Sequence, residues 1–380
     1  MLSPFKYAWL LVVINRLRES IMKRLSPLQQ NHQLGHAATE DWEIHQVDVK
    51  SAYLYAPLKE KVYMKPLPGI LRPGDEGKVI HVVKCLYGLK QAGRGWYKEM
   101  SQVFMNELGF KQPALDHSIF YQHFGDECTV VAVATDDIVL TLNSHTHINK
   151  LKSGLCQYWD ISDLGELHWY LGFEVQCDWA AWTISINQAA YIDQMVAKFQ
   201  LTNAKPVTMP MEPGAWYTKK QCPSSLWQIT QMQNIPYAEV IGSVLWPVVI
   251  SWLDCSYATL ILSQFIQNPA KVHWEALKHV IIYLRSTKHY WLTFGGHTKP
   301  LATGYCDSDW ASQAHHHLIL GYSFHLVQGA VTWSSKKQYI IALLSTEAEY
   351  IMQTHTVKEA LWLCSIFGRT PKYWAYNDGD

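Results

Sequence analysis

Residues Cys128 to Leu142 read CTVVAVATDDIVLTL. Two apolar runs, rich in valine, isoleucine and leucine, flank the adjacent carboxylates Asp136 and Asp137. Apolar runs on both sides of a short polar step are typical of a β-hairpin whose turn presents the polar residues. The stretch therefore predicts an antiparallel hairpin with two carboxylates at its tip. Taken alone, an adjacent Asp pair indicates no more than a polar turn.

A third carboxylate has a similar apolar setting nearer the N-terminus. Asp48 lies in the segment HQVDVKSAYL, residues 45–54, and the alternating run from Trp42 to Leu54 predicts a strand that enters a turn or helix. An unpaired charge is costly to bury, so carboxylates at strand ends favour cations. Two divalent ions about 4 Å apart could activate a 3′-hydroxyl and stabilise a leaving pyrophosphate. Mg²⁺ suits this chemistry because it takes few protein ligands and completes its shell with substrate phosphates.

Composition places the chain among globular proteins of two or three domains. It has 380 residues, of which 48% are apolar and 17% are charged. The 32 basic and 32 acidic residues cancel, which counts mildly against a nucleic-acid enzyme. Between Lys50 and Glu99, however, ten basic residues face four acidic ones, and this excess of six could neutralise phosphates. An ordinary solvated surface is the alternative interpretation.

Cysteine and histidine spacing argues against a zinc or redox protein. The eight cysteines are scattered without a CxxC pair, which favours a reducing, intracellular compartment. The adjacent His315-His316-His317 point in different directions and have no partner ligands at metal spacing. The apolar run from Tyr7 to Ile14 is too short to span a bilayer, and no small-residue cleavage site follows it. We therefore expect neither a membrane anchor nor a signal peptide.

Apolar periodicity predicts the remaining elements. A helix is expected over 87–110, where Trp96, Met100, Val103 and Phe104 recur at helical spacing. Residues 203–236 are rich in Pro, Gln and Ser and predict an extended connection. A second unit is expected to begin near Pro300. The other predicted elements are helices over 191–199, 258–266, 272–284 and 346–367, a strand over 302–310, and two strands over 321–333 around Gln328-Gly329.

Five blocks of sequence recur in the order and at the separations of one known family. The blocks are HQVDVKSAYL at 45–54, VYMKPLPG at 62–69, CLYGLKQAGRGWY at 85–97, DHSIF at 116–120 and LGELHWYLG at 164–172. In these blocks the chain resembles the reverse transcriptases of copia-type retrotransposons (Pseudoviridae). The resemblance implies an α+β fold: a reverse-transcriptase palm and thumb with an antiparallel sheet, followed by a truncated RNase H-like α/β domain. Most of the family has YVDD where this chain has Ala134-Thr135-Asp136-Asp137, a variation tolerated in fungal relatives, so a fungal lineage is expected.

The resemblance also assigns roles to individual residues. Asp48, Asp136 and Asp137 would be the metal-binding aspartates of the palm. Tyr53 would lie under the nucleotide sugar, where its ring can exclude a 2′-hydroxyl, unless it is a core tyrosine. The expected nucleotide- and template-binding residues are Lys84 and Lys90 for phosphates, and Gln91 and Arg94 for the nucleotide or template side. For these four, solvated surface residues are the alternative.

The C-terminal part is similar to the RNase H of the same family. GYCDSDWA at 304–311, WSSKKQ at 333–338 and STEAEY at 345–350 carry this resemblance, which makes Asp307 the first metal ligand and Glu349 the second. The family's third carboxylate belongs to an Asp-Asn pair, but this chain has Asn377-Asp378, reversed or shifted by one position. A one-residue shift in a strand turns a side chain to the other face. RNase H activity is therefore expected to be absent.

The resemblance divides the chain into four segments and names its partners. The segments are a divergent 1–40 that lacks most of the fingers, a palm and fingers remnant over 41–202, a thumb and connection over 203–295, and a truncated RNase H-like domain over 296–380. The expected partners are an RNA template, a DNA primer, an RNA–DNA hybrid and dNTPs, with Mg²⁺, or Mn²⁺ in its place, as cofactor. The expected location is intracellular, in a cytoplasmic particle or the nucleus, and neither secretion nor a membrane partner is expected.

Whether this copy is active is left open. Trp252 and Leu253 stand where the family has Arg-Pro, and each is a change that a single C-to-T mutation can produce. A decaying copy without its fingers would lose substrate positioning, which is most of phosphoryl-transfer catalysis. The alternative to an RNA-directed DNA polymerase fragment is therefore a catalytically dead, nucleic-acid-binding remnant.

Overall fold

The computed structural model describes residues 31, 33–35, 37, 38, 42–66, 77–113, 117–124, 127–296, 302–309, 319–337 and 345–367. They divide into two compact units, the first of residues 42–167 and the second of the described residues between 31 and 38 together with 168–367. Both units combine helices with antiparallel sheets, which confirms the expected α+β class. The expectations for Tyr7–Ile14, the three adjacent histidines and Asn377-Asp378 concern residues outside this description. Within the described residues, no helix is long and apolar enough to cross a membrane.

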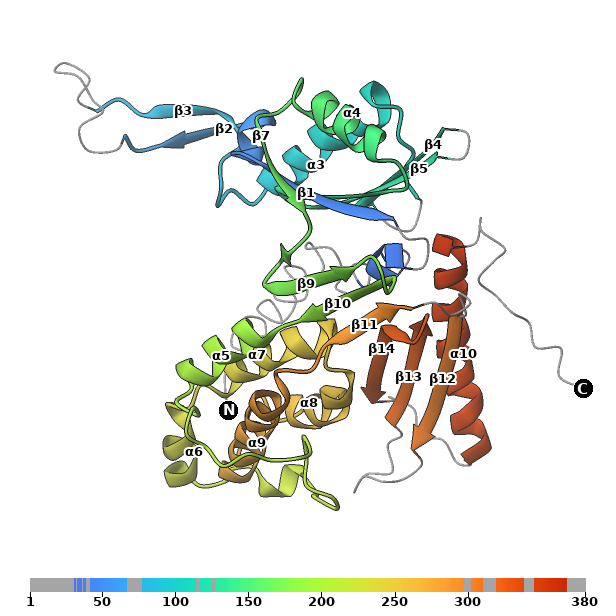
Figure 1. The fold of residues 1–380 in the computed structure, drawn as a ribbon. Coiled ribbons are helices and arrows are strands. Elements are labelled where there is room, and N and C mark those ends of the chain that lie inside the picture. Colours follow the sequence, from blue (N-terminus) through green and yellow to red (C-terminus); the bar gives the residue numbers. More distant parts are fainter. Residues whose placement is uncertain are drawn as a thin grey trace, which may run out of the picture. The chain divides into compact units, whose positions relative to one another are not determined.

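The first unit is built on a five-stranded antiparallel sheet in the order β4-β5-β6-β1-β7 (Figure 1). Its strands are β1 (Glu43–Val49), β4 (Ile119–Phe124), β5 (Glu127–Ala134), β6 (Asp137–Leu142) and β7 (Ile161–Glu166). The hairpin predicted around the Asp pair is β5–β6, and its two-residue turn is Thr135-Asp136. A short hairpin of β2 (Pro57–Met64) and β3 (Ile80–Lys84) completes the strands of this unit.

Helices cover one face of this sheet. They are α3 (Ala92–Gln102), a π-helical turn η2 (Val103–Glu107) that continues it, and α4 (His145–Leu155). One buried cluster joins Val47 and Ile138 of the strands to Phe104 and Ile148 of the helices. Because side chains alternate along a strand, Asp48 and Asp137, next to Val47 and Ile138, lie on the opposite face.

The start of α3 differs from the prediction, which placed it at residue 87. Residues 86–89 form a turn instead, and Gly88 adopts φ 93°, a left-handed conformation that ends any regular helix. Gly95 lets α3 approach its neighbours closely, because a Cβ there would lie 2.8 Å from Cys85 Sγ and 3.4 Å from Ala56 Cβ. The 3₁₀ turn η1 (Ala52–Tyr55) connects β1 to this region.

The second unit has a helical core formed by α5 (Ala189–Lys198), α7 (Tyr237–Ile250), α8 (Ser256–Ser263) and α9 (Lys271–Thr287). Three of these helices confirm predicted ones to within a few residues. The segment 203–236, predicted as a linker or extended connection, contains two short helical elements that were not predicted, η3 (Lys219–Gln221) and α6 (Leu226–Gln233). A capping box at the start of α6 explains this, since Ser225 Oγ accepts from the Gln228 N–H and the Gln228 side chain accepts from the Ser225 N–H.

Proline inside α7 requires a substitute hydrogen-bond donor. Pro247 has no N–H, so it cannot bond to the carbonyl of Ser243 four residues earlier. The hydroxyl of Tyr191 in α5 donates to that carbonyl at 3.0 Å. The α5–α7 contact therefore supplies the bond that the helix itself cannot make.

Two further sheets complete the second unit. One has the order β11-β10-β9-β8, and the other is the meander β12-β13-β14. Their strands are β8 (Trp169–Tyr170), β9 (Phe173–Asp178), β10 (Thr183–Asn187), β11 (Leu292–Gly295), β12 (Ala302–Asp309), β13 (Ile319–Leu326) and β14 (Gly329–Lys337). The meander and the long helix α10 (Ser345–Phe367) confirm the predicted strands and C-terminal helix. The turn lies at Val327-Gln328, one residue before the predicted position, and both residues have positive φ, 47° and 70°.

Candidate active site

Strand pairing brings the three carboxylates of the first unit together. Asp48 of β1 is the direct register partner of Asp137 of β6, so both side chains lie on the sheet face opposite α3 and α4. Asp136 precedes Asp137 in the turn, and its carbonyl accepts from the N–H of Val49 at 2.9 Å. Residues predicted from two separate motifs are thus neighbours at one end of the sheet.

The turn that carries Asp136 is held in a conformation that is costly for its first residue. Thr135 has φ 63°, in the left-handed region that β-branched residues rarely adopt. The indole N–H of Trp96 in α3 donates to the Thr135 carbonyl. Trp96 is only 2% exposed and belongs to the buried cluster between the sheet and the helices of the first unit, so this bond ties the turn to that cluster.

Two carboxylates also accept side-chain hydrogen bonds. Gln46 Nε2 donates to Asp137 Oδ1 at 2.9 Å, and the Tyr87 hydroxyl donates to Asp136 Oδ2 at 3.3 Å. Gln46 and Tyr87 were not among the residues expected to form the site. Gln46 was open to prediction, because it stands two residues before Asp48 in a strand and so shares its face. Tyr87 was not, because its contact depends on the tertiary fold.

The electrostatics of this group favour a bound cation. Burial, and then the nearby Asp136 carboxylate, raise the pKa of Asp48 above its ordinary value, although Lys50 opposes the shift. Burial also raises the pKa of Asp137, against the hydrogen bond from Gln46, and the carboxylates of Asp136 and Asp48 add to the rise. Carboxylates that repel one another in this way are stabilised when a cation lies between them.

All the candidate donors are carboxylate oxygens, which Mg²⁺ and Mn²⁺ prefer. With the side chains as they stand, however, no three His, Cys, Asp or Glu residues of the described part converge closely enough to hold an ion. The chemistry of the donor set therefore fits a divalent ion, whereas the side-chain positions do not form a closed site.

The residues expected to bind nucleotide or template lie in η1, at the end of β3, and just before and within the start of α3. Tyr53 lies in η1, is half-buried, and has its ring centroid 4.4 Å from that of Tyr87. Lys84 ends β3, Lys90 lies in the loop before α3, and Arg94 lies in the first turn of α3. These three cations are exposed, and Gln91, directly before α3, is half-buried.

The two faces of the β12-β13-β14 sheet pack against different helices. Thr332 Oγ1 donates to Glu359 Oε1 of α10 at 2.9 Å, whereas the indole N–H of its neighbour Trp333 donates to the Val248 carbonyl of α7 at 2.9 Å. Adjacent residues of a strand point to opposite faces. The sheet therefore lies between α10 and the helical core.

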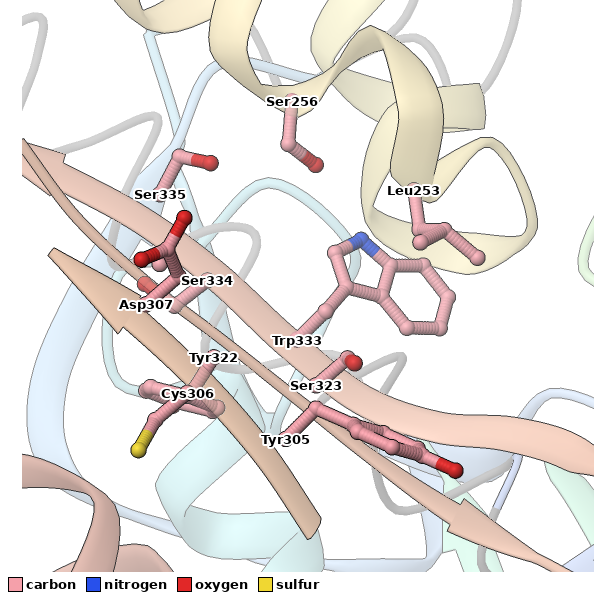
Figure 2. A pocket seen from close by; sticks show the side chains of 11 residues that line it. Leu253, Ser256, Tyr305, Cys306, Asp307, Tyr322, Ser323, Trp333, Ser334 and Ser335 are labelled. Carbon is pink, nitrogen blue, oxygen red and sulfur yellow. The ribbon is translucent and has the colours of Figure 1, made fainter. Parts of the chain in front are cut away.

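Asp307 and Glu349, the expected RNase H ligands, are not brought together. Asp307 is the register partner of Gly321, which is in turn the register partner of Ser335. Ser335 lies two residues after Trp333, so Asp307 is on the sheet face that is turned to α7 and α8. There it lines a pocket of about 250 Å³, and Figure 2 shows its carboxylate beside Ser335 on the side of Ser256. Glu349 is an exposed residue of α10, the helix that covers the other face.

Comparison with known proteins matches residues 26–213 to the family model described as "Reverse transcriptase (RNA-dependent DNA polymerase)". The match begins inside the segment 1–40 that the motifs leave unassigned. The chain is 35% identical over 332 residues to the Pol polyprotein of transposon TNT 1-94 from Nicotiana tabacum, which covers 87% of the chain and 25% of that protein. It is 34% identical over 336 residues to the Pol polyprotein of transposon RE1 from Arabidopsis thaliana, with 88% and 22% covered. The putative transposon Ty5-1 protein YCL074W of Saccharomyces cerevisiae is 28% identical over 319 residues, 82% of the chain and 100% of that protein.

The chain belongs to the copia-type retrotransposon reverse transcriptases. It is the reverse transcriptase region of a Pol polyprotein and spans about a quarter of the length of the first two relatives.

One departure from the copia-type pattern is accommodated by the fold. Trp252, where the family has Arg, is 6% exposed and packs edge-on to Tyr283, with ring centroids 6.4 Å apart at 84°. The Tyr283 hydroxyl donates to Asp254, the acid of the same motif. The substituted residue has thus become part of the helical core.

Proposed function

We propose that this copia-type chain is an RNA-directed DNA polymerase region that adds deoxynucleotides to a DNA primer on an RNA template. The observation that carries the proposal is that Asp48 and Asp137 are register partners on the sheet face opposite α3 and α4, with Asp136 in the adjoining turn. The raised pKa values of Asp48 and Asp137 support it, because burial first, and then repulsion from neighbouring carboxylates, disfavour their charged forms.

Asp48, Asp136 and Asp137 would hold a pair of Mg²⁺ or Mn²⁺ ions. Such ions, when bound, lower the pKa of the primer 3′-hydroxyl and neutralise charge on the leaving pyrophosphate. Within the protein, the Gln46 amide orients Asp137 and the Tyr87 hydroxyl orients Asp136. Trp96 keeps the turn that carries Asp136 fixed to the core.

The substrates would be bound by groups around this end of the sheet. The Tyr53 ring would lie under the deoxyribose and leave no room for a 2′-hydroxyl. The exposed cations Lys84, Lys90 and Arg94 would contact phosphates, and Gln91 would face the nucleotide or template. The RNA–DNA hybrid formed by synthesis is the expected product partner.

We further infer that residues 41–202 are the palm and a fingers remnant, that 203–295 form the thumb and connection, and that β12 to α10 belong to an RNase H-like remnant. RNase H cleavage would be absent, because Asp307 and Glu349 belong to opposite sides of the sheet. Metal-dependent cutting of an RNA–DNA hybrid by the purified chain would contradict this. We also propose a reducing compartment inside the cell, since the scattered cysteines show no disulfide spacing.

Primer extension tests the polymerase proposal. The purified chain is given an RNA template, a DNA primer and dNTPs, in Mg²⁺ and separately in Mn²⁺, beside Asp136→Asn and the control Glu174→Gln. Glu174 is an exposed carboxylate of β9 outside the proposed site. We expect extension by the unmodified chain and the control and none by Asp136→Asn. If the folded chain extends nothing, the proposal is overturned, and retention of the hybrid on a filter would identify a nucleic-acid-binding remnant.

A further inference from the structure

Tyr87 connects two parts of the candidate site that come from separate segments of the chain. Its hydroxyl, in the loop before α3, donates to Asp136 Oδ2 in the β5–β6 turn at 3.3 Å. Its ring centroid lies 4.4 Å from that of Tyr53 in η1, with the ring planes at 54°. One side chain therefore contacts both a proposed metal-binding carboxylate and the ring proposed to pack against the sugar.

The backbone holds Tyr87 in place although 56% of the residue is exposed. The N–H of Leu89 donates to the Leu86 carbonyl at 3.2 Å, which closes a four-residue turn with Tyr87 in its second position. Gly88, in the third position, has φ 93°, as a type II turn requires. Cys85, directly before the turn, is 1% exposed. An ordinary surface tyrosine on a flexible loop would lack this support.

We propose that Tyr87 is a positioning residue of the polymerase site, which orients the Asp136 carboxylate through its hydroxyl and holds the Tyr53 ring through its own ring. This inference rests on the proposed polymerase function. The orientation of the Asp136 carboxylate and the preference for deoxyribose over ribose would then both depend on the Tyr87 side chain. Because hydroxyl and ring have different tasks, substitution can separate them.

Steady-state kinetics of two variants test the two tasks. Tyr87→Phe keeps the ring and removes the hydroxyl, so kcat should fall about tenfold while KM for dNTP and the preference for dNTP over rNTP stay unchanged. Tyr87→Leu removes both groups, so the preference for dNTP should also fall, by about tenfold. Tyr63→Phe is the matched control, because Tyr63 on β2 is 58% exposed and has a ring contact with His81, away from the carboxylates. A Tyr87→Phe enzyme with the kcat of the unmodified chain would overturn the proposal.

A second measurement does not need polymerase activity. Tyrosine labelled with ¹³C at Cζ gives one NMR signal per residue, and the Tyr87 signal is identified by its loss in Tyr87→Phe. Asp136→Asn should shift this signal, whereas Glu174→Gln should not. An unmoved signal would overturn the contact between Tyr87 and Asp136, whether or not the chain extends primers. A shifted signal in a chain without extension would instead reject the polymerase function and leave the contact established.

Discussion

The hydrogen bond from Tyr191 to the Ser243 carbonyl should contribute measurably to the free energy of unfolding. Pro247 leaves that carbonyl without its helical donor, and the Tyr191 hydroxyl, 3.0 Å away, takes the place of the missing N–H. In Tyr191→Phe the carbonyl of α7 keeps no such partner at a half-buried contact between helices. The expected loss in the free energy of unfolding is about 1–2 kcal/mol.

Replacing the proline changes that expectation in a defined direction. In Pro247→Ala the new N–H can bond to the Ser243 carbonyl, so the further change Tyr191→Phe should cost only about 0.5 kcal/mol. The coupling in this double-mutant cycle is therefore about 1 kcal/mol, irrespective of the packing that Pro247→Ala itself removes. Urea unfolding of the four proteins, followed by circular dichroism and fluorescence, measures it. Tyr257→Phe, at an exposed tyrosine of α8, is the control and should change stability by less than about 0.5 kcal/mol. Equal costs of Tyr191→Phe in both backgrounds would show that the Tyr191 hydroxyl does not replace the missing N–H of Pro247.

Three further predictions concern packing, titration and strain. Gly95→Ala should destabilise the chain by about 1–3 kcal/mol in urea unfolding, because the new Cβ would lie 2.8 Å from Cys85 Sγ. Gly93→Ala is the control on the same helix. Its Cβ would point into open space, so this variant should stabilise the chain by about 0.5–1 kcal/mol. Similar effects at both glycines would contradict the close approach. Burial lowers the pKa of His273 from 6.5 to about 4. As the pH falls, the unfolded chain therefore binds the proton before the folded chain does. The free energy of unfolding should keep its full value above pH 6.5 and fall by up to about 3 kcal/mol as the pH drops to 4. His273→Gln should flatten the stability curve in that window, and an unchanged slope would count against the assignment. Thr135→Gly should stabilise the chain by up to about 1 kcal/mol by relieving the left-handed backbone at φ 63°, and a loss of stability would argue that no strain is stored there.

The sequence pattern was enough to predict those helices and strands whose formation depends mainly on residues within the segment itself. The hairpin around Asp136 and Asp137 was predicted because two apolar runs flank a short polar turn, and β5–β6 confirms it. Helices α9 and α10 were predicted to within three residues of their ends. Composition misled at α6, because Pro, Gln and Ser suggested an extended chain while the capping box of Ser225 and Gln228 began a helix. A local hydrogen-bond motif there outweighed the average character of the segment.

In the candidate site, too, some residues were predictable from sequence and others were not. Asp48, Asp136 and Asp137 were identified from motifs, and the register of β1 with β6 makes two of them direct neighbours. The partners that orient them were not identified. Gln46 followed from strand alternation and was overlooked, whereas no local pattern marks Tyr87, since its contact spans 49 positions of the chain.

The family, the α+β class, the carboxylate-bearing hairpin and most of the helices follow from residue order and local periodicity alone. The faces that those elements bury and the partners that they contact depend on tertiary packing. Alternation predicts that Asp307 and its neighbours point to opposite faces of β12, but the helices that pack against the sheet decide which face is turned to α10. In the same way, the missing donor at Pro247 is evident in the sequence, while the choice of Tyr191 to replace it depends on how α5 packs on α7. A chain's own spacing limits what each segment can form, and contacts between distant segments select among those forms.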